Sequence, residues 1–201
     1  MLKLHYAART RSARVLWLLE ELGLPYELVR GEFVPPATKF FDQATPTGKF
    51  PTLEDGDVVM CESGAIVEYI LERYGGGRLA PAPGSPERAA FLQWLHFAES
   101  TAFPPVGIVV WLSRYRAGAD GESLLADALE RARSGFDFLE RELGEKRFLL
   151  GEEFSAADIM MGFTLLAAQS VGALDDRHSK VKAYLQRLLE RPALQKVAAQ
   201  Q

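Results

Sequence analysis

Residues 45–66 constrain the fold of this 201-residue chain more than any other segment. Pro51 precedes an apolar run that ends at Asp55-Gly56, a dipeptide typical of a tight hairpin turn. A second apolar run follows, and Glu62-Ser63 then opens an apolar helical pattern. A proline beside a strand belongs at its first residue or at an edge, because it cannot donate to the ladder. The segment therefore predicts a loop, a hairpin with strands at 52–53 and 58–61, and a helix.

The ends of this hairpin carry groups suited to binding. Where a proline such as Pro51 is cis, the backbone N–H and C=O of the residue before it turn outward. Ser63 offers a hydroxyl at the start of a helix, where unbonded N–H groups favour an anionic ligand group. The segment thus predicts a surface for a peptide backbone beside a surface for a carboxylate.

This ordered set of motifs resembles the glutathione-binding half of the cytosolic glutathione transferases. That family carries Pro-x-Gly-x-hydrophobic-Pro-x-Leu, which reads PTGKFPTL at residues 46–53, followed by a Glu/Gln-Ser pair, here Glu62-Ser63. The resemblance covers essentially the whole chain and implies glutathione as co-substrate. By this resemblance, the backbone of Phe50, before the cis Pro51, pairs with the cysteinyl unit, and Glu62 and Ser63 hold the γ-glutamyl end.

The N-terminal residues predict a βαβ unit. Leu2–Tyr6 alternates like a short strand, an apolar helix runs from Ser12 to a stop at Gly23, and residues 26–29 form a second strand. Strands joined by such a crossover are parallel. The opposite side of this helix, predicted to face water, carries Glu20 and Glu21.

The complete order is β-α-β, α, β-β-α, the thioredoxin-like arrangement of the resembled family. The central α is a short helix predicted at 39–43 within an irregular stretch. We therefore predict an α/β thioredoxin-like domain at 1–78, a proline-containing linker at 79–85 and an all-α helical bundle domain at 86–201.

Three local signals define the helices of the second domain. Ser85-Pro86 predicts a capped helix start, and Pro104-Pro105 is expected to kink or break the following helix. Ser155 with Asp158 reads as a capping box, which the resemblance assigns to folding and not to substrate binding.

The activating group of the family lies in the turn after the first strand, where it favours the thiolate, the reactive form of a thiol. At this place Arg9 departs from the Ser, Cys or Tyr that is usual in the family. Thr10 carries the hydroxyl nearest to the family's position, and Ser12 resembles a helix cap. Three accounts stay open: donation by Thr10, charge stabilisation by Arg9, or backbone N–H groups alone in a weak site. Tyr6 is a fourth possibility.

The resemblance also implies contacts further along both substrates. Lys39 and Lys49 flank the binding loop and are candidates for the glycine carboxylate of glutathione. A pocket for a small hydrophobic electrophile is expected between the two domains. Its candidates lie at helical spacing from the residue before the proline pair onward: Phe103, Val106, Val110, Trp111, Arg114 and Tyr115.

Composition excludes several other classes. A net charge of −4 gives no reason to expect nucleic acid or an anionic membrane as partner, and no apolar run reaches the length of a membrane span. Met1-Leu-Lys-Leu-His lacks the core of a signal peptide. The single cysteine, Cys61, excludes an internal disulfide and a Cys-x-x-Cys pair, which disfavours glutaredoxin. The histidines, at 5, 96 and 178, show no metal-ligand spacing, so we predict no metal.

These observations together predict a cytoplasmic, homodimeric glutathione transferase that conjugates glutathione to hydrophobic electrophiles. Glutathione-dependent reduction of peroxides or disulfides would use the same site. A binding module that keeps the fold but has lost efficient catalysis is the alternative outside the enzymes.

Overall fold

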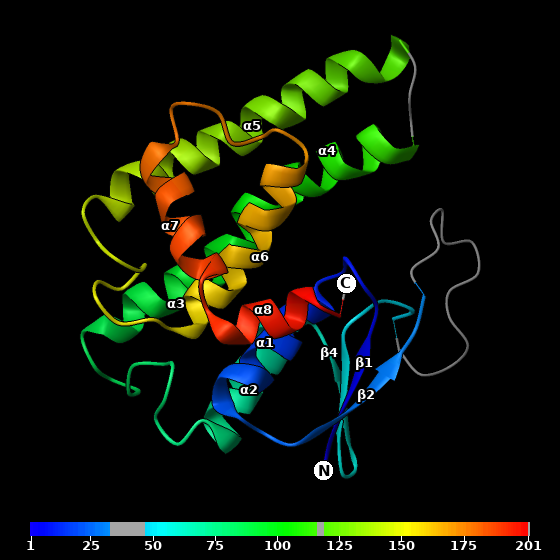
Figure 1. Cartoon of the computed structure of the whole chain (residues 1–201), viewed down its shortest axis with the longest axis vertical. Helices are drawn as coiled ribbons and strands as arrows, with labels where there is room; N and C mark the ends of the chain where they lie inside the picture. Colours follow the sequence, from blue (N-terminus) through cyan, green and yellow to red (C-terminus); the bar gives the residue numbers. More distant parts are fainter. Residues whose placement is uncertain (33–46, 116–118, 201) are drawn as a thin grey trace. The chain divides into compact units, whose positions relative to one another are not determined.

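The computed structural model describes residues 1–32, 47–115 and 119–200 (Figure 1), leaving out the side chains of residues 115, 119 and 120. Two compact units make up the chain. Unit 1 is Met1–Ala80 with Glu190–Gln201, and unit 2 is Pro81–Leu189. The predicted short helix at 39–43 lies outside the described residues.

Unit 1 is built on a four-stranded sheet in the order β2-β1-β3-β4. Its strands are β1 (Leu2–Tyr6), β2 (Tyr26–Arg30), β3 (Thr52–Asp55) and β4 (Val58–Cys61). The β1–β2 pair is parallel, and the β1–β3 and β3–β4 pairs are antiparallel, which confirms the predicted fold class. Strand β3 is longer than predicted because Glu54 pairs with Lys3 of β1.

The helices of unit 1 gather on one side of this sheet: α1 (Ser12–Leu22), α2 (Ser63–Tyr74) and α8 (Pro192–Ala198) (Figure 1). Helix α1 contacts β1, α2 and α8, and therefore buries residues on most of its circumference. It ends at Gly23, whose φ of 63° is readily adopted only by a residue without a Cβ.

Helix α8 is attached to α1 by charged side chains. The Glu21 carboxylate accepts hydrogen bonds from Arg191 Nε (2.6 Å) and Nη2 (2.7 Å) and from Trp17 Nε1 (2.9 Å). Its neighbour Glu20 accepts one from Lys196 Nζ at 3.0 Å. The prediction that both glutamates simply face water was therefore wrong. The structure also groups the last residues of the predicted helical domain, 190–201, with unit 1.

The named elements described in unit 2 are all helical, and an isolated β-bridge pairs Phe148 with Gly151. The helical elements are α3 (Glu87–Phe97), the π-helical turn η1 (Ala98–Ala102), α4 (Phe103–Tyr115), α5 (Ala119–Leu143), α6 (Ala156–Ser170) and α7 (Ser179–Leu189). Among the helices whose residues are described, none combines the length and apolar character that a membrane span needs.

The predicted interruption near Pro104-Pro105 takes the form of a π-helical turn. Both prolines fall in the first turn of α4, directly after η1. Proline removes a backbone donor and crowds the carbonyl of the preceding turn, and a π-helical turn is one recognised way to accommodate such a disturbance.

The predicted hydroxyl cap at Ser85 was wrong. Helix α3 begins at Glu87 without a side-chain cap, and Ser85 Oγ is buried without a hydrogen-bond partner among the described residues. The Ser85 carbonyl instead accepts from the Arg88 N–H at 3.1 Å.

Asp158 lies in the core of unit 2, with no exposed surface. Its carboxylate accepts from the Ser155 N–H (2.8 Å), the Leu149 N–H (2.9 Å) and the Tyr184 hydroxyl (2.7 Å). Burial raises the pKa of Asp158 even though these bonds favour its charged form. This network joins the loop before α6 to α7 and gives Asp158 a structural role.

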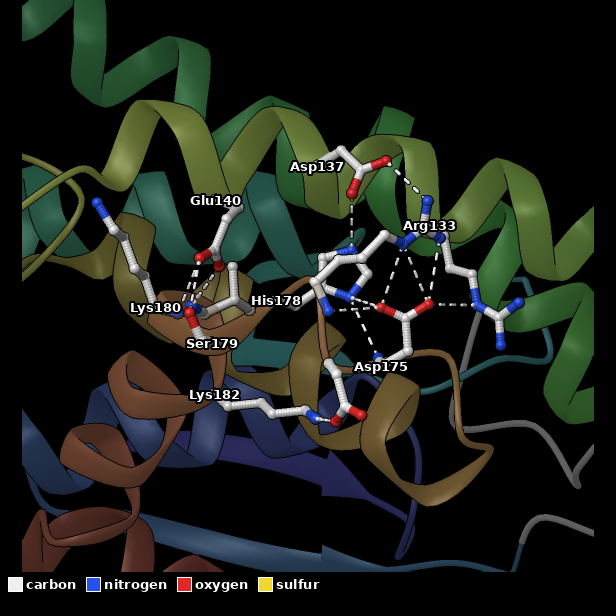
Figure 2. A network of polar contacts seen from close by, with 11 residues as sticks. Arg133, Asp137, Glu140, Asp175, His178, Ser179, Lys180 and Lys182 are labelled. Carbon is white, nitrogen blue, oxygen red and sulfur yellow. Dashed lines mark hydrogen bonds and ion pairs between the residues drawn. The ribbon is translucent and has the colours of Figure 1, made fainter.

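A second polar network fastens the segment before α7 to α5 (Figure 2). His178 is fully buried, its Nδ1 accepts from the Asp175 N–H at 3.2 Å, and its Nε2 lies 3.2 Å from Asp137 Oδ1 of α5. Also on α5, Glu140 accepts from two N–H groups in the first turn of α7, those of Lys180 and Val181, both at 2.9 Å. A carboxylate at this end of a helix is favoured by the helix dipole.

Candidate functional site

The register of the sheet brings the predicted binding segments to one edge. His5, near the end of β1, pairs with Thr52, the first residue of β3, and Thr52 pairs with Cys61, the last residue of β4. The turn after β1, the loop before β3 and the start of α2 therefore leave the sheet at the same end. Segments about 40 or 50 positions apart in sequence become neighbours in this way.

Hydroxyl groups close the turn after β1. Thr10 Oγ1 donates to the Ala7 carbonyl at 2.8 Å, and Ser12 Oγ lies 3.0 Å from the same carbonyl oxygen. The two hydroxyl oxygens are 2.7 Å apart. Backbone donors complete the cluster, since the Ala7 N–H donates to Ser12 Oγ (3.2 Å) and the Ser12 N–H to Thr10 Oγ1 (3.3 Å).

Ser12 is not the helix cap that its position suggested. It is the first residue of α1, Arg11 precedes it with helical backbone angles, and no side chain caps this end of the helix. The Ser12 hydroxyl is fully buried and bonds backwards to the turn because Ala7 presents both an N–H and a carbonyl to it.

Arg9 has an exposed side chain and a φ of 60°. This left-handed conformation is uncommon outside glycine and occurs mostly in turns and at functional sites. The next residue, Thr10, is half-buried just before the start of α1. Tyr6, the fourth candidate, lies at the end of β1 and is only 1% exposed.

The start of α2 combines a hydroxyl with a buried cation. Ser63 is 3% exposed, and the fully buried Arg14 of α1 donates from Nη1 to its Oγ at 3.1 Å. Burial first, and then the charge of Arg11, lowers the pKa of Arg14. Sequence reasoning missed Arg14, although an arginine within the apolar stripe of a helix was a signal for a buried polar contact.

The backbone at the start of α2 is arranged to bind an anion. Glu62 is exposed, has a φ of 69° and makes no side-chain cap. The first intrahelical bond runs from the Ile66 N–H to the Glu62 carbonyl at 2.9 Å. The N–H groups before Ile66 have no partner within the helix, and with the Ser63 hydroxyl they form a suitable site for a carboxylate.

The loop before β3 contains a cis peptide bond between Phe50 and Pro51, as the motif predicted. Gly31 makes room for the Phe50 ring, because a Cβ at position 31 would lie 2.3 Å from Phe50 Cζ. The Gly31 N–H also donates to the Tyr6 carbonyl at 2.8 Å. Lys49 is exposed beside this loop, and Lys39 lies outside the described residues.

The electrophile candidates lie on α4. Phe103 is half-buried and packs on Phe163 with ring centroids 5.8 Å apart, and Val106 is fully buried, so it belongs to the core of unit 2. Trp111 is 43% exposed. The remaining candidates are the half-buried Val110, the exposed Arg114, and Tyr115, whose side chain is not described.

Cys61 and His5 are both engaged in contacts across the sheet. Cys61 Sγ lies 3.7 Å from Thr52 Oγ1, and His5 Nε2 lies 2.5 Å from Glu54 Oε1. Within the part of the chain that the structure describes, no group of three or more His, Cys, Asp or Glu side chains is arranged to hold a metal ion.

Comparisons with known proteins point to one family. The family model described as "Glutathione S-transferase, N-terminal domain" matches residues 5–78, and the corresponding C-terminal model matches residues 122–187. Glutathione S-transferase 1 of Triticum aestivum is 33% identical over 94% of this chain and 89% of its own length. Glutathione S-transferase GstB of Escherichia coli is 31% identical over 94% of this chain and 92% of its own length.

Solved structures of similar proteins include complexes with glutathione. A glutathione transferase from Phanerochaete chrysosporium with oxidized glutathione has a TM-score of 0.84 and 26% identity, over 99% of this chain and 94% of that chain. A family member from Pseudomonas fluorescens with two glutathione molecules bound has a TM-score of 0.82 and 26% identity, over 98% of this chain and 91% of that chain.

Proposed function

The chain belongs to the glutathione S-transferase family, and on that premise we propose that it conjugates glutathione to small hydrophobic electrophiles. The observation that carries this proposal is the meeting of two kinds of group at one edge of the sheet. Ser63 and the start of α2 suit a carboxylate, and the Thr10 hydroxyl lies in the turn where the family activates sulfur.

We assign the γ-glutamyl end of glutathione to the start of α2. Ser63 Oγ and the N–H groups there bind the carboxylate, and the exposed Glu62 carboxylate binds the amino group. The family resemblance assigns the cysteinyl unit to the backbone of Phe50 beside Pro51. Lys49, with Lys39 by resemblance, is proposed to bind the glycine carboxylate.

The sulfur atom is proposed to meet the turn after β1. Thr10 donates one hydrogen bond to the thiolate, and Arg9 adds positive charge beside it. The thiol proton passes to solvent, and a sulfur electron pair forms the new C–S bond. In a substitution the bond to the leaving group breaks and its electron pair departs with that group. In a conjugate addition the π pair of the attacked C=C bond shifts to the α-carbon and its electron-withdrawing group, and the α-carbon then takes up a proton.

The electrophile is proposed to contact the face of α4 that carries Phe103, Val110, Trp111, Arg114 and Tyr115. Trp111 supports this assignment because so large an apolar side chain is 43% exposed. Arg114, also exposed, adds a cation to this face.

We further propose that the protein is a cytoplasmic homodimer. The edge strand β4 exposes 41% of Val58 and 53% of Val59. Edge strands with exposed apolar residues readily associate with another chain unless they are covered. A second copy of this chain is the proposed cover.

Glutathione-affinity retention followed by activity assays tests the function. We expect retention and glutathione-dependent consumption of an aromatic halide and of an activated alkene. Retention with activity only toward peroxides or mixed disulfides would replace conjugation by reduction. Retention without turnover of any of these substrates would favour a binding module, in keeping with the unusual Arg9. Absence of retention would overturn conjugation, reduction and the binding module alike, because all three require bound glutathione.

The roles of Thr10 and Arg9 are distinguished by measuring the pKa of the bound glutathione thiol. This pKa is followed through thiolate absorbance as pH is varied. Thr10→Val keeps the shape and removes the donor, so we expect a raised pKa, whereas Thr10→Ser retains the wild-type value. Arg9→Lys keeps part of the charge effect and Arg9→Gln little. A raised pKa in Arg9→Gln with none in Thr10→Val would transfer the main role to Arg9.

A further inference from the structure

The Thr10 and Ser12 hydroxyls both contact a single carbonyl oxygen, that of Ala7, and also contact each other. Thr10 Oγ1 lies 2.8 Å and Ser12 Oγ 3.0 Å from the Ala7 oxygen, and the two hydroxyl oxygens are 2.7 Å apart. Each hydroxyl has one proton. Three contacts of hydrogen-bond length therefore share two protons, and the cluster has more than one proton arrangement.

The choice between these arrangements decides where the Thr10 proton points. When Thr10 donates to the Ala7 carbonyl, its proton is unavailable to a ligand. When Ser12 donates to that carbonyl, Thr10 can turn its proton away without leaving the carbonyl unpaired. Ala7 is only 1% exposed, so an unpaired carbonyl there would carry a desolvation penalty.

We propose that Ser12 is a positioning residue that takes over the Ala7 carbonyl when glutathione binds and so releases the Thr10 proton to the sulfur. This inference rests on the proposed role of Thr10. Because Ser12 is fully buried and contacts Thr10 and the Ala7 carbonyl, it is assigned an action through these two residues. No bond other than hydrogen bonds changes, and no proton leaves either hydroxyl.

The backbone bonds of the cluster keep the exchange local. The Ala7 N–H donates to Ser12 Oγ, and the Ser12 N–H donates to Thr10 Oγ1. Both hydroxyl oxygens therefore retain an acceptor bond that fixes their positions while their protons turn. An exchange of this kind needs rotation about two C–O bonds and no movement of the turn.

The test compares the pKa of the bound thiol in Ser12→Ala, Ser12→Thr, Thr10→Val and the Ser12→Ala/Thr10→Val double variant. One ordinary hydrogen bond corresponds to about 0.5 to 1 pKa unit, so Ser12→Ala should raise the thiol pKa by that amount or less. Ser12→Thr keeps the hydroxyl and should restore the wild-type value. In the double variant, the Ser12 change should add nothing beyond Thr10→Val, because its effect passes through Thr10.

Thr164→Val is the matched control for loss of a buried hydroxyl. Thr164 Oγ1 donates to the Ala98 carbonyl at 3.1 Å within unit 2, so this variant should lower the melting temperature and leave the thiol pKa unchanged. If Ser12→Ala is too unstable to bind glutathione, Ser12→Cys, which keeps a donor at the same position but a weaker one, replaces it and should raise the thiol pKa.

The outcomes separate this inference from the proposed function. An unchanged thiol pKa in Thr10→Val, with glutathione bound, would overturn the role of Thr10 itself. A raised pKa in Thr10→Val with none in Ser12→Ala would overturn only the role of Ser12. Additive shifts in the double variant would also overturn it, since they would show that Ser12 acts independently of Thr10.

Discussion

Arg14, completely buried in α1, donates from Nη1 to the hydroxyl oxygen of Ser63 across 3.1 Å. This bond occupies an acceptor position of Ser63 Oγ and leaves its proton to point elsewhere. The guanidinium also places a positive charge beside the start of α2, where the helix dipole has the same sign. Both effects favour a carboxylate as the group that Ser63 binds.

Removal of the Ser63 hydroxyl should weaken glutathione binding. We expect Ser63→Ala to cost about 1–3 kcal/mol of binding free energy, because Arg14 and the ligand carboxylate both lose a hydrogen-bond partner. Calorimetric titration with glutathione measures this loss. Ser63→Thr keeps the hydroxyl and is the matched control. Equal affinities for the wild type and Ser63→Ala would remove Ser63 from the binding site.

Asp158 should affect folding and leave the chemistry unchanged. Asp158→Ala removes the acceptor of buried donors on Ser155, Leu149 and Tyr184. We therefore expect a loss of about 3 kcal/mol in the free energy of unfolding, measured by urea denaturation. Tyr184→Phe removes one of these donors and should cost about 1 kcal/mol. An Asp158→Ala protein of unchanged stability but reduced activity per folded molecule would contradict the structural role.

Local patterns were sufficient to predict most of unit 1. The strand β1, the stop at Gly23 and the hairpin turn before β4 follow from periodicity and turn chemistry, which act over a few residues. The Glu62-Ser63 pair was found because it lies in an ordered motif. The regular structure of unit 2 was likewise predictable from its helical pattern, and the family resemblance supplied the order of the elements.

Long-range contacts account for what the sequence did not reveal. Arg14 meets Ser63 from 49 positions away, and Glu21 meets Arg191 from 170 positions away. A helical pattern indicates that Glu21 lies opposite the apolar stripe, but it cannot indicate that α8 returns to cover that side. Ser12 was misassigned for a similar reason, because a hydroxyl at a helix start can bond forwards to the helix or backwards to the turn.

Asp55 should contribute to the pH dependence of stability. Its carboxylate accepts from the Tyr74 hydroxyl at 2.5 Å and the Tyr69 hydroxyl at 2.7 Å. The pKa of Asp55 is lowered mainly by the hydrogen bond from Tyr74, then by the one from Tyr69, and further by the charge of Arg73. The folded protein therefore holds this proton less tightly than the unfolded chain does. The resulting stability is present above the ordinary aspartate pKa of about 4 and is lost as pH falls through the lower folded pKa.

Melting temperatures of the wild type and Asp55→Asn between about pH 3 and 7 test this linkage. We expect Asp55→Asn to melt lower at neutral pH and to lose less stability on acidification, so that the two curves converge at low pH. Asp57→Asn is the matched control, since Asp57 is exposed in the adjacent turn, and its curve should run parallel to that of the wild type. A parallel curve for Asp55→Asn would contradict the assignment.

Two ion pairs join α1 to the C-terminal helix, one to Arg191 just before α8 and one to Lys196 within it, and they should differ in strength. Glu21 and Arg191 form a two-pronged pair whose side chains are only 9% and 27% exposed. Glu20 and Lys196 form a single bond, and the lysine side chain is 68% exposed. Paired hydrogen bonds between a guanidinium and a carboxylate fix both position and orientation, and a partly buried carboxylate left without its partner is costly. An exposed pair contributes little.

Loss of Arg191 should therefore release α8, whereas loss of Lys196 should not. We expect Arg191→Ala to cost about 2–3 kcal/mol and to speed hydrogen exchange of the α8 amides, because Glu21 keeps a buried charge without its partner. Arg191→Lys keeps the charge but not the two-pronged geometry, so its stability should fall between those of the wild type and Arg191→Ala. Lys196→Ala, the matched control within α8, should change stability by less than about 1 kcal/mol. Equal exchange rates in Arg191→Ala and Lys196→Ala would show that α8 is held by its apolar residues, Leu194 and Val197 among them, and that the Glu21 pair contributes nothing to its attachment.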